Sequence, residues 1–348
     1  MTQPLVTINI VVHNGGKYIR WCLDSVLKQT YPHEQIEINI LDNNSDDNTW
    51  EIIDAESEVW KMQIPKLSFF TQEKNLGMWP GQEWLLEHSH GKYIVALSVD
   101  VLLEHNFIKN VVKAMEEDEK IGALQGKIMK YELGSMNYGS IKKTDVIDTV
   151  GFEIYKSRRI VNIGHGEKDI GQYEKKVEIF GVEGAVPIFR KEALDNIKID
   201  GHIIDPDFFW YGDDLDLAWR INMFGWKQVY TPNVIAWHDR KTTKELAGGK
   251  WKSFIKIRKT VPKFKRRLDY RNWLFTIIKN DFTSNIIKDF GPILKRQVML
   301  WAYFLVFEPW MVLEIPTIVK MVPKMVKRRK GVMKKTRIEA KKIRKWFK

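Results

Sequence analysis

Short apolar runs alternate with segments of helical periodicity over the first hundred residues, and this alternation restricts the fold more than any other feature of the chain. The runs VTINIVV, at residues 6–12, and IEINILD, at residues 36–42, flank a segment in which Ile19, Leu23 and Val26 recur at helical spacing. A strand, a helix and a second strand in this order form a βαβ unit with a parallel pair of strands. We therefore expect an α/β fold with a mostly parallel central sheet.

Polar residues follow the expected strands. The alternating pattern continues with strands at 67–71 and 93–100 and with helices near 46–60, 81–88 and 104–115. Asn14, Asp42 and Asp100 stand at or just beyond three strand ends. Ligands of open α/β sheets bind at the carboxyl ends of the strands, so we expect these residues to converge on one edge. Each could also be an ordinary turn residue, because Asp and Asn are common in turns.

Residues 120–180 contain strand-like pieces and a glycine-rich loop, NIGHGEKDIGQY, which we expect to move or to bind something. The β-α pattern resumes at 181–194 (GVEGAVPIFRKEAL), and two further strands are expected at 227–231 and 234–238.

The stretch FFWYGDDLDLAWR, at residues 208–220, places three carboxylates among aromatic side chains. Such carboxylates are costly to desolvate unless something pairs with them or uses them. Apolar residues recur at helical spacing after the first two acids, so Asp213 or Asp214 could simply cap a helix. We assign Asp216 and Arg220 to structure, as an i, i+4 ion pair.

Charge divides the chain into an acidic body and a basic end. Of the formal charge of +12, residues 1–248 contribute −10, from 28 Lys and Arg against 38 Asp and Glu, and residues 249–348 contribute +22, from 28 against 6. We expect residues 1–245 to form one domain and residues 246–348 a basic, amphipathic helical region on an anionic membrane surface. Nucleic acid is an unlikely partner because no recognition motif accompanies the charge. The alternative is a helical region packed on its own body with a solvated basic face.

The most apolar part of this region, residues 298–307, is interrupted by Glu308 and Pro309. A spanning helix needs about 20 predominantly apolar residues, so the pattern indicates a segment that lies in a membrane interface rather than crossing it.

Cys22, the one cysteine, excludes an internal disulfide and a cysteine-based zinc site. The first residues lack the pattern of a secretory signal, and we expect a cytoplasmic protein, peripheral on the inner face of the cell membrane.

Three pieces of the sequence stand in a fixed order: LDNNSDDNT, ALSVDVLLE, and WYGDDLDLAWR followed by VIAWH. With NLGMWPGQEWLL and GAVPIFRKEAL they resemble the inverting family 2 glycosyltransferases of the GT-A fold, especially the branch that looks like rhamnosyltransferases, over roughly residues 5–240. The resemblance implies an enzyme that moves a sugar from a nucleotide-diphosphate sugar to a lipid-linked or polysaccharide acceptor in cell-surface glycan synthesis.

The resemblance also implies roles for individual residues. Asp100 and His238 would hold a divalent ion, Mn²⁺ or Mg²⁺, that bridges the two phosphates of the donor. Family members usually carry an acid where this chain has Ser98, which leaves the metal affinity open. The residues expected at the donor are Asn14, Asp42, Asn75, Ser98 and Asp100.

The acid pair carries the catalytic base in the family, and the matching position is Asp214. The N-terminus of its helix would keep Asp214 ionised, while Asp213 would orient it or bind the acceptor. Trp210 and Tyr211 could stack on a sugar or pack in the core.

Two alternative functions share part of this reasoning. The acceptor could be polyprenyl phosphate itself. The chain could also be a non-catalytic protein that binds nucleotide sugar or an anionic polymer; Ser98 favours this alternative, and the pair Asp213 and Asp214 argues against it.

Overall fold

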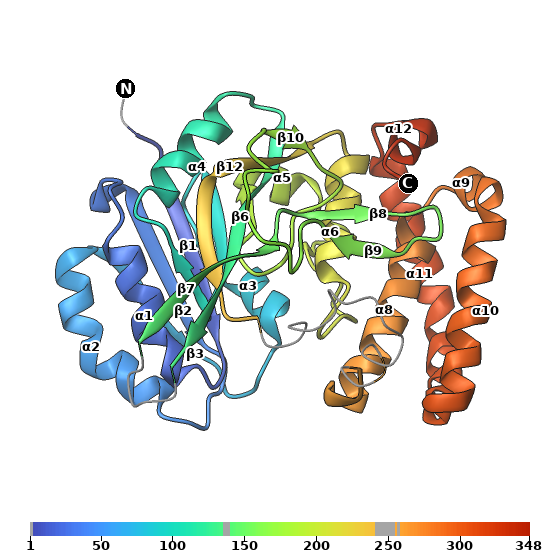
Figure 1. The fold of residues 1–348 in the computed structure, drawn as a ribbon, viewed down its shortest axis with the longest axis horizontal. Helices are drawn as coiled ribbons and strands as arrows, with labels where there is room; N and C mark the ends of the chain where they lie inside the picture. Colours follow the sequence, from blue (N-terminus) through green and yellow to red (C-terminus); the bar gives the residue numbers. More distant parts are fainter. Residues whose placement is uncertain (1–2, 135–139, 241–254, 256–257) are drawn as a thin grey trace.

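A computed structural model describes residues 3–134, 140–240, 255 and 258–348. Four parallel strands form one half of its central sheet, in the order β3, β2, β1, β4 (Figure 1). They are β1 (Val6–Val12), β2 (Ile36–Asp42), β3 (Lys66–Thr71) and β4 (Tyr93–Ser98). The expected α/β class and the parallel βαβ unit are confirmed.

Helices cover both faces of this parallel half, which explains why β1, β2 and most of β4 are continuously buried rather than alternating. Ile10 and Ile40 belong to the same apolar cluster as Ile19 of α1, whereas Val11 and Leu41 pack with Leu85 of α3. The helices of this half are α1 (Gly16–Leu27), α2 (Thr49–Gln63), α3 (Met78–Leu86) and α4 (Phe107–Glu116), with a short 3-10 helix η1 at His33–Gln35.

The other half of the sheet is mixed. The short strand β11 (Ile188–Arg190) runs antiparallel between β4 and β6 (Ile121–Leu133), and β12 (Lys227–His238) pairs parallel with β6. The two strands expected at 227–231 and 234–238 are thus a single strand, with an irregularity between Tyr230 and Ile235. The remaining elements are β5 (Val101–Leu103), β7 (Ile141–Thr149), β10 (Val177–Glu178), the pair β8 (Phe152–Ile154) and β9 (Ile160–Asn162), α5 (Lys191–Asn196) and α6 (Asp213–Met223).

The C-terminal region is helical, as expected, and packs against the body (Figure 1). Its elements are α8 (Lys263–Asn280), α9 (Thr283–Lys288), α10 (Phe290–Phe307), the 3-10 helix η3 (Pro309–Glu314), α11 (Ile315–Lys335) and α12 (Ala340–Arg344). Met325, Ile343 and Phe347 are buried in one apolar cluster with Trp219 of the body. The packed arrangement that the sequence left open is therefore observed. The expected domain boundary at residue 245 lies outside the described residues.

Buried acids shape the turn between α10 and α11. Glu308 accepts hydrogen bonds from Arg258 and Arg266, each at 2.8 Å, and Glu314 pairs with Arg267 and Arg271. These ion pairs explain why carboxylates interrupt the apolar sequence there. Within the described residues, no single helix is long and apolar enough to cross a membrane; α10 and Pro309–Lys335, bent by 118°, meet that test only as a pair.

Candidate active site

The polar residues expected at the strand ends do meet at one edge of the sheet. Val12 of β1 lies opposite Asp42 of β2, and Val11 lies opposite Ser98 of β4. Asn14 follows β1 by two residues, and Asp100 lies in the turn between β4 and β5. The parallel register thus brings the predicted donor residues together, apart from Asn75, which comes from a neighbouring loop.

Ser45 joins the loops that follow β1 and β2. Its hydroxyl donates to Asp42 Oδ1 at 2.5 Å, and the Asn14 backbone N–H donates to Ser45 Oγ at 3.0 Å. The Asp46 backbone N–H donates to Asn14 Oδ1 at 2.9 Å, while Asn14 holds a left-handed φ of 56°. These bonds fix the directions of Asn14 and Asp42.

Asn43, which the sequence analysis missed, anchors Asn75. Its Nδ2 donates to Asn75 Oδ1 at 3.0 Å, and the same oxygen accepts from the Gly77 N–H at 2.8 Å. Gly77 has a φ of 93°, and a Cβ there would lie 2.5 Å from the Phe209 carbonyl oxygen, so only glycine allows this approach. The Asn75 loop therefore contacts the segment that precedes Asp214. The only signal for Asn43 was its place beside Asp42 in LDNN.

His238, at the end of β12, lies between two carboxylates. Its Nε2 is 3.5 Å from Asp100 Oδ2, and its Nδ1 is 2.9 Å from Asp148 Oδ2. Burial lowers the pKa of His238, but Asp100 and Asp148 outweigh burial and raise it to about 10. The family resemblance placed Asp100 and His238 at one site but gave no role to Asp148, which lies on β7 in the segment that had no clear pattern.

Asp148 also contacts Arg240 and His165. Arg240 Nε donates to it at 2.9 Å, and His165 of the glycine-rich loop lies 3.3 Å from its Oδ1. Burial acts to raise the pKa of Asp148, yet His165, His238 and Arg240 hold it well below its usual range. Asp148 is thus an anion that orients His238 and attaches the glycine-rich loop to the sheet.

Asp100 and His238 fit a divalent ion that completes its coordination with other ligands. Among the residues that the structure describes, no group of three or more His, Cys, Asp or Glu side chains is arranged to hold a metal alone. One carboxylate and one imidazole nevertheless converge, and Asp148 on the far nitrogen is the usual orienting partner of a ligating histidine. Such a pair leaves coordination positions for phosphate oxygens and water.

Asp214 is the second residue of α6 and is half-buried. Its Oδ1 accepts the N–H of Leu215 at 2.8 Å. Burial, and then the negative charge of Glu183, raise the pKa of Asp214 to about 6, while Arg240 acts to lower it. The expected effect of the helix N-terminus is therefore outweighed, although a carboxylate with this pKa is still ionised at neutral pH.

Arg240 connects Asp148, beside His238, with Glu183, whose charge acts on Asp214. It donates to Asp148 on one side and to Glu183 on the other. A continuous series of charged side chains thus runs from His238 to the surroundings of Asp214. The sequence analysis missed Glu183 and Arg240, although Arg240 stands two residues after His238 in WHDR.

The other two acids of α6 are buried. Asp213 Oδ1 has no hydrogen-bond partner within the described structure, and burial raises the pKa of Asp213 well above its ordinary value, with Asp214 and Asp216 adding to the shift. Asp213 therefore lies in the interior, where an acceptor has little access to it. Asp216 pairs with Arg220 at 2.8 Å and with Lys279 at 2.9 Å, which confirms its predicted ion pair.

Helix α8 holds the residues just before Asp214. Asn272 Nδ2 donates to the carbonyl oxygens of Trp210 and Tyr211, both at 2.9 Å. Tyr211 and Gly212 have φ values of 66° and 81°, so the chain makes a left-handed turn there. Trp210 is 38% exposed. Its ring stacks on that of Tyr211, and Lys265 Nζ lies 3.6 Å from the ring centroid. Of the predicted acceptor residues, Trp210 is thus on the surface, and Tyr211 is half-buried three residues before Asp214.

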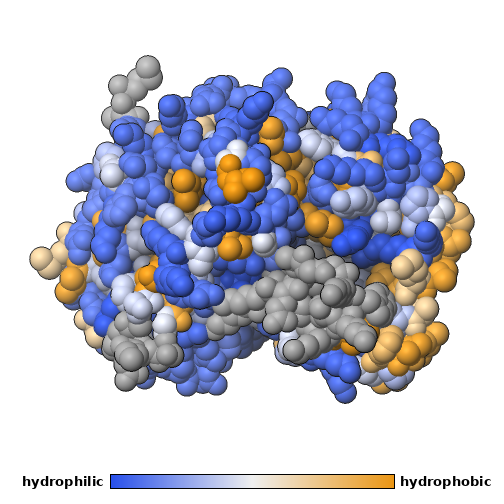
Figure 2. Space-filling view, in the orientation of Figure 1, coloured by the Kyte–Doolittle hydropathy of each residue, from blue (hydrophilic) through white to orange (hydrophobic). Residues whose placement is uncertain are grey.

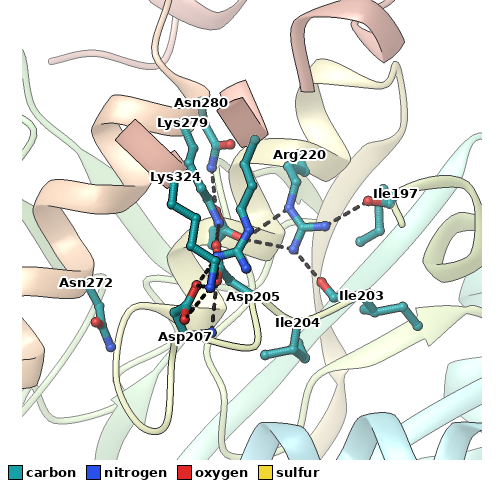
Figure 3. A network of polar contacts seen from close by, with 12 residues as sticks. Ile197, Ile203, Ile204, Asp205, Asp207, Arg220, Asn272, Lys279, Asn280 and Lys324 are labelled. Atoms are coloured by element: carbon teal, nitrogen blue, oxygen red, sulfur yellow. Dashed lines mark hydrogen bonds and ion pairs between the residues drawn. The ribbon is translucent and has the colours of Figure 1, made fainter. Parts of the chain in front are cut away.

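A partly buried ionic network ties the same segment to the C-terminal helices (Figure 3). Asp205 pairs with Lys279 of α8 at 2.5 Å and with Arg328 of α11, and Asp207 pairs with Lys324 of α11 at 2.7 Å. The segment from Asp205 to Asp216 is thereby held by two helices that lie far along the chain.

Solved structures share this fold. GalNAc-T7 with UDP, GalNAc and Mn²⁺ superposes with a TM-score of 0.58 at 14% identity, over 80% of this chain and 48% of the other. The mannosyltransferase PcManGT of Pyrobaculum calidifontis, in complex with GDP-Man and Mn²⁺, superposes with a TM-score of 0.53 at 14% identity, over 96% and 86%. At such identities the likeness shows the GT-A transferase fold and confirms the predicted fold class.

Curated relatives match part of the chain. Glycosyltransferase GlyG of Streptococcus pneumoniae is 30% identical over 117 residues, 34% of this chain and 37% of the relative. A dolichyl N-acetyl-alpha-D-glucosaminyl phosphate 3-beta-D-2,3-diacetamido-2,3-dideoxy-beta-D-glucuronosyltransferase of Methanococcus voltae is 27% identical over 129 residues, 36% and 39%. The chain thus spans less than two fifths of the length of these relatives. The rhamnosyltransferase-like branch stays a prediction. Residues 7–198, more than half of the sequence, match the model of glycosyl transferase family 2, and the chain therefore belongs to that family.

Proposed function

We propose that this protein transfers a sugar from a nucleoside diphosphate sugar to a hydroxyl of a glycan or lipid-linked acceptor in cell-surface glycan synthesis, with inversion at the anomeric carbon. The observation that carries the proposal is Asp214, a half-buried carboxylate with a raised pKa of about 6. It lies beside exposed aromatic rings and is connected through Glu183 and Arg240 to the strand edge. A perturbed carboxylate in such a place is typical of a catalytic group.

The strand edge suits the donor. Asn14, Asp42 and Asn75 offer amide and carboxylate groups of fixed direction for the base and ribose. Asp100 and His238 would hold a divalent ion, which supplies positive charge for the departing diphosphate. The solved neighbours hold UDP or GDP-Man together with Mn²⁺, and this supports the same donor class and ion here.

Asp214 suits the base. At neutral pH it is ionised, yet a pKa of about 6 makes it a better proton acceptor than an ordinary Asp. As the acceptor oxygen forms its bond to the anomeric carbon, its proton passes to Asp214. The bond from that carbon to the diphosphate breaks on the opposite face, so one displacement inverts the configuration.

The acceptor class and the location are parts of the same proposal. The Methanococcus voltae relative is named for transfer to a dolichyl-linked sugar phosphate, which supports a lipid-linked acceptor. A lipid-linked acceptor requires a membrane, and the net charge of +22 over residues 249–348 favours the anionic inner face.

The test is release of nucleoside diphosphate from a panel of UDP-, dTDP- and GDP-sugars, with Mn²⁺, Mg²⁺ or chelator, and with or without membrane lipid extract. We expect one donor class to be used, only with metal, and release to be lost in Asp214→Asn. Release from no donor, together with no donor binding in calorimetry, would contradict the proposal and favour a non-catalytic role.

A further inference from the structure

An apolar surface is exposed where α10 turns into α11. We call it the elbow surface and define it by Val298, Met299, Leu305, Val306, Leu313 and Val319, each at least 58% exposed. Figure 2 shows apolar residues gathered along the edge of the molecule that α10 and η3 form. Single exposed apolar residues are ordinary, but a continuous set of large ones marks an interaction site.

The pattern of α10 shows that this exposure is built into the helix. Positions 298, 299, 302, 305 and 306 recur at helical spacing and are all apolar and exposed, while Tyr303 and Phe304 on the opposite side are buried. The helix is thus apolar on both sides, although only one side packs on the protein. The elbow continues this surface, because Met311 and Ile318 are buried and Leu313 and Val319 face outward.

Basic residues border the elbow surface. Lys320, Lys327, Lys330 and Lys334 of α11 are exposed, and within the described residues none of them forms an ion pair, unlike Lys324 and Arg328 of the same helix. From Phe290 to Lys335 the sequence contains only two acids, Glu308 and Glu314, and both are buried against arginines. An apolar strip bordered by unpaired lysines complements an anionic lipid surface.

We propose that the elbow surface docks on an anionic bilayer, with its apolar side chains at the boundary of headgroups and acyl chains and the lysines of α11 on the headgroups. This inference rests on the membrane location in the proposed function and names the surface responsible. It agrees with the expectation that residues 298–307 lie in a membrane interface. It differs from the expectation for the basic tail, because Met325, Ile343 and Phe347 of that tail are buried against the body.

The placement of the elbow suits a lipid-linked acceptor. In Figure 1, α10 descends to the elbow at the end of the molecule toward which β1 also runs. The carboxyl ends of the parallel strands, where the candidate site lies, therefore face the same side as the elbow surface. A second copy of the chain is the less suitable occupant, because like charges would face one another across a symmetric contact.

Vesicle flotation tests the inference with the full chain. Vesicles of phosphatidylcholine and phosphatidylglycerol in equal parts are compared with vesicles of phosphatidylcholine alone. We expect binding to the anionic vesicles, a loss of about tenfold or more in Leu305→Glu/Val306→Glu, and a loss of about fivefold for each of Lys320→Ala and Lys327→Ala. The matched controls are Val59→Glu/Met62→Glu on α2 and Lys109→Ala on α4, which change equally exposed residues elsewhere and should bind like the wild type.

Circular dichroism and donor binding by calorimetry on each variant show that the fold and the donor site are intact, so failure of docking is separated from failure of the proposed function. Equal binding of the wild type and Leu305→Glu/Val306→Glu would overturn the inference, as would no binding of the wild type. A dimer in sedimentation without lipid that becomes monomeric in the same variant, with no vesicle binding, would identify a second copy as the occupant and also overturn it.

Discussion

The proposed donor half and the proposed acceptor half of the candidate site are built in different ways. On the donor half, Asp42 is fixed by Ser45, three residues away, and Asn14 and Asn75 are fixed by loops 31 and 32 residues away. On the acceptor half, the segment before Asp214 is held by Asn272, 62 residues beyond Trp210, and by Arg328, 123 residues beyond Asp205.

The difference teaches which part of the chain determines which function. Bonds between neighbouring loops follow from the parallel sheet alone, so Asn14, Asp42 and Asn75 need little beyond residues 1–100. The acceptor half depends on α8 and α11, and α11 also contributes Val319 to the elbow surface. The acceptor and the membrane are therefore expected to be selected by the C-terminal region, and the donor by the N-terminal strands.

Asp214→Asn is the change with the largest expected effect. If Asp214 is the general base, kcat falls by about 10² to 10⁴, while the Kd for the donor stays the same. Because burial raises the pKa of Asp214, its charge opposes folding at neutral pH, so the variant should unfold at a Tm no lower than that of the wild type. Steady-state kinetics, calorimetry and thermal unfolding test these points, with the exposed Asp195→Asn as control. An unchanged kcat would remove Asp214 from the mechanism.

Lys279→Met tests the ionic attachment of the acceptor half. Lys279 neutralises Asp205 and Asp216, which are both buried, so its loss leaves two carboxylates without one of their cations. Breaking a buried pair costs about 3–5 kcal/mol. Urea unfolding at neutral pH should show this loss. The control Lys198→Met, which breaks the exposed pair with Asp195, should change stability by less than about 1 kcal/mol. Equal effects of the two variants would refute the importance of the network.

Asn272→Ala separates positioning from stability. The variant leaves the carbonyl groups of Trp210 and Tyr211 without their donor, at a cost of about 1–3 kcal/mol. We expect kcat to fall about tenfold with the donor Kd unchanged. Asn285→Ala is the matched control, because Asn285 is equally buried and donates to the Ala340 carbonyl within the C-terminal region. The control should lose similar stability and keep its kcat. If both variants lose kcat alike, Asn272 has only a structural role.

These contacts also show how far the sequence could predict the site. The convergence of Asn14, Asp42 and Asp100 was predictable because a parallel register places strand ends side by side, and local patterns define the strands. Asp148 was not, because β7 pairs antiparallel with β6 in a stretch whose polar and apolar residues follow no simple period. Asn272 could not be predicted from the sequence for a different reason. Its partners are two backbone carbonyls, which no side-chain pattern encodes.

The pH dependence of kcat should report Asp214. With a pKa of about 6, the base loses activity as the pH falls below that value, about tenfold for each further pH unit. Glu183 raises this pKa, so Glu183→Gln should move the acid limb of the profile to lower pH. An acid limb at the same pH in Glu183→Gln would show that another group controls the rate.

Ser45→Ala has the smallest expected effect and tests the donor half. The variant removes the bonds from Ser45 to Asp42 and Asn14, at a net cost of about 0.5–1.5 kcal/mol. The Kd for a nucleoside diphosphate in calorimetry should rise by about three- to tenfold, because the Asp42 side chain loses its fixed direction and the Asn14 backbone loses its attachment. The kcat at saturating donor should change little. Asn272→Ala should lower kcat and leave the Kd for the donor unchanged. The division of the site holds only if Ser45→Ala acts on donor binding and Asn272→Ala acts on turnover. If each variant changed both quantities, the two halves would form one cooperative unit, and the C-terminal helices would shape the donor pocket as well.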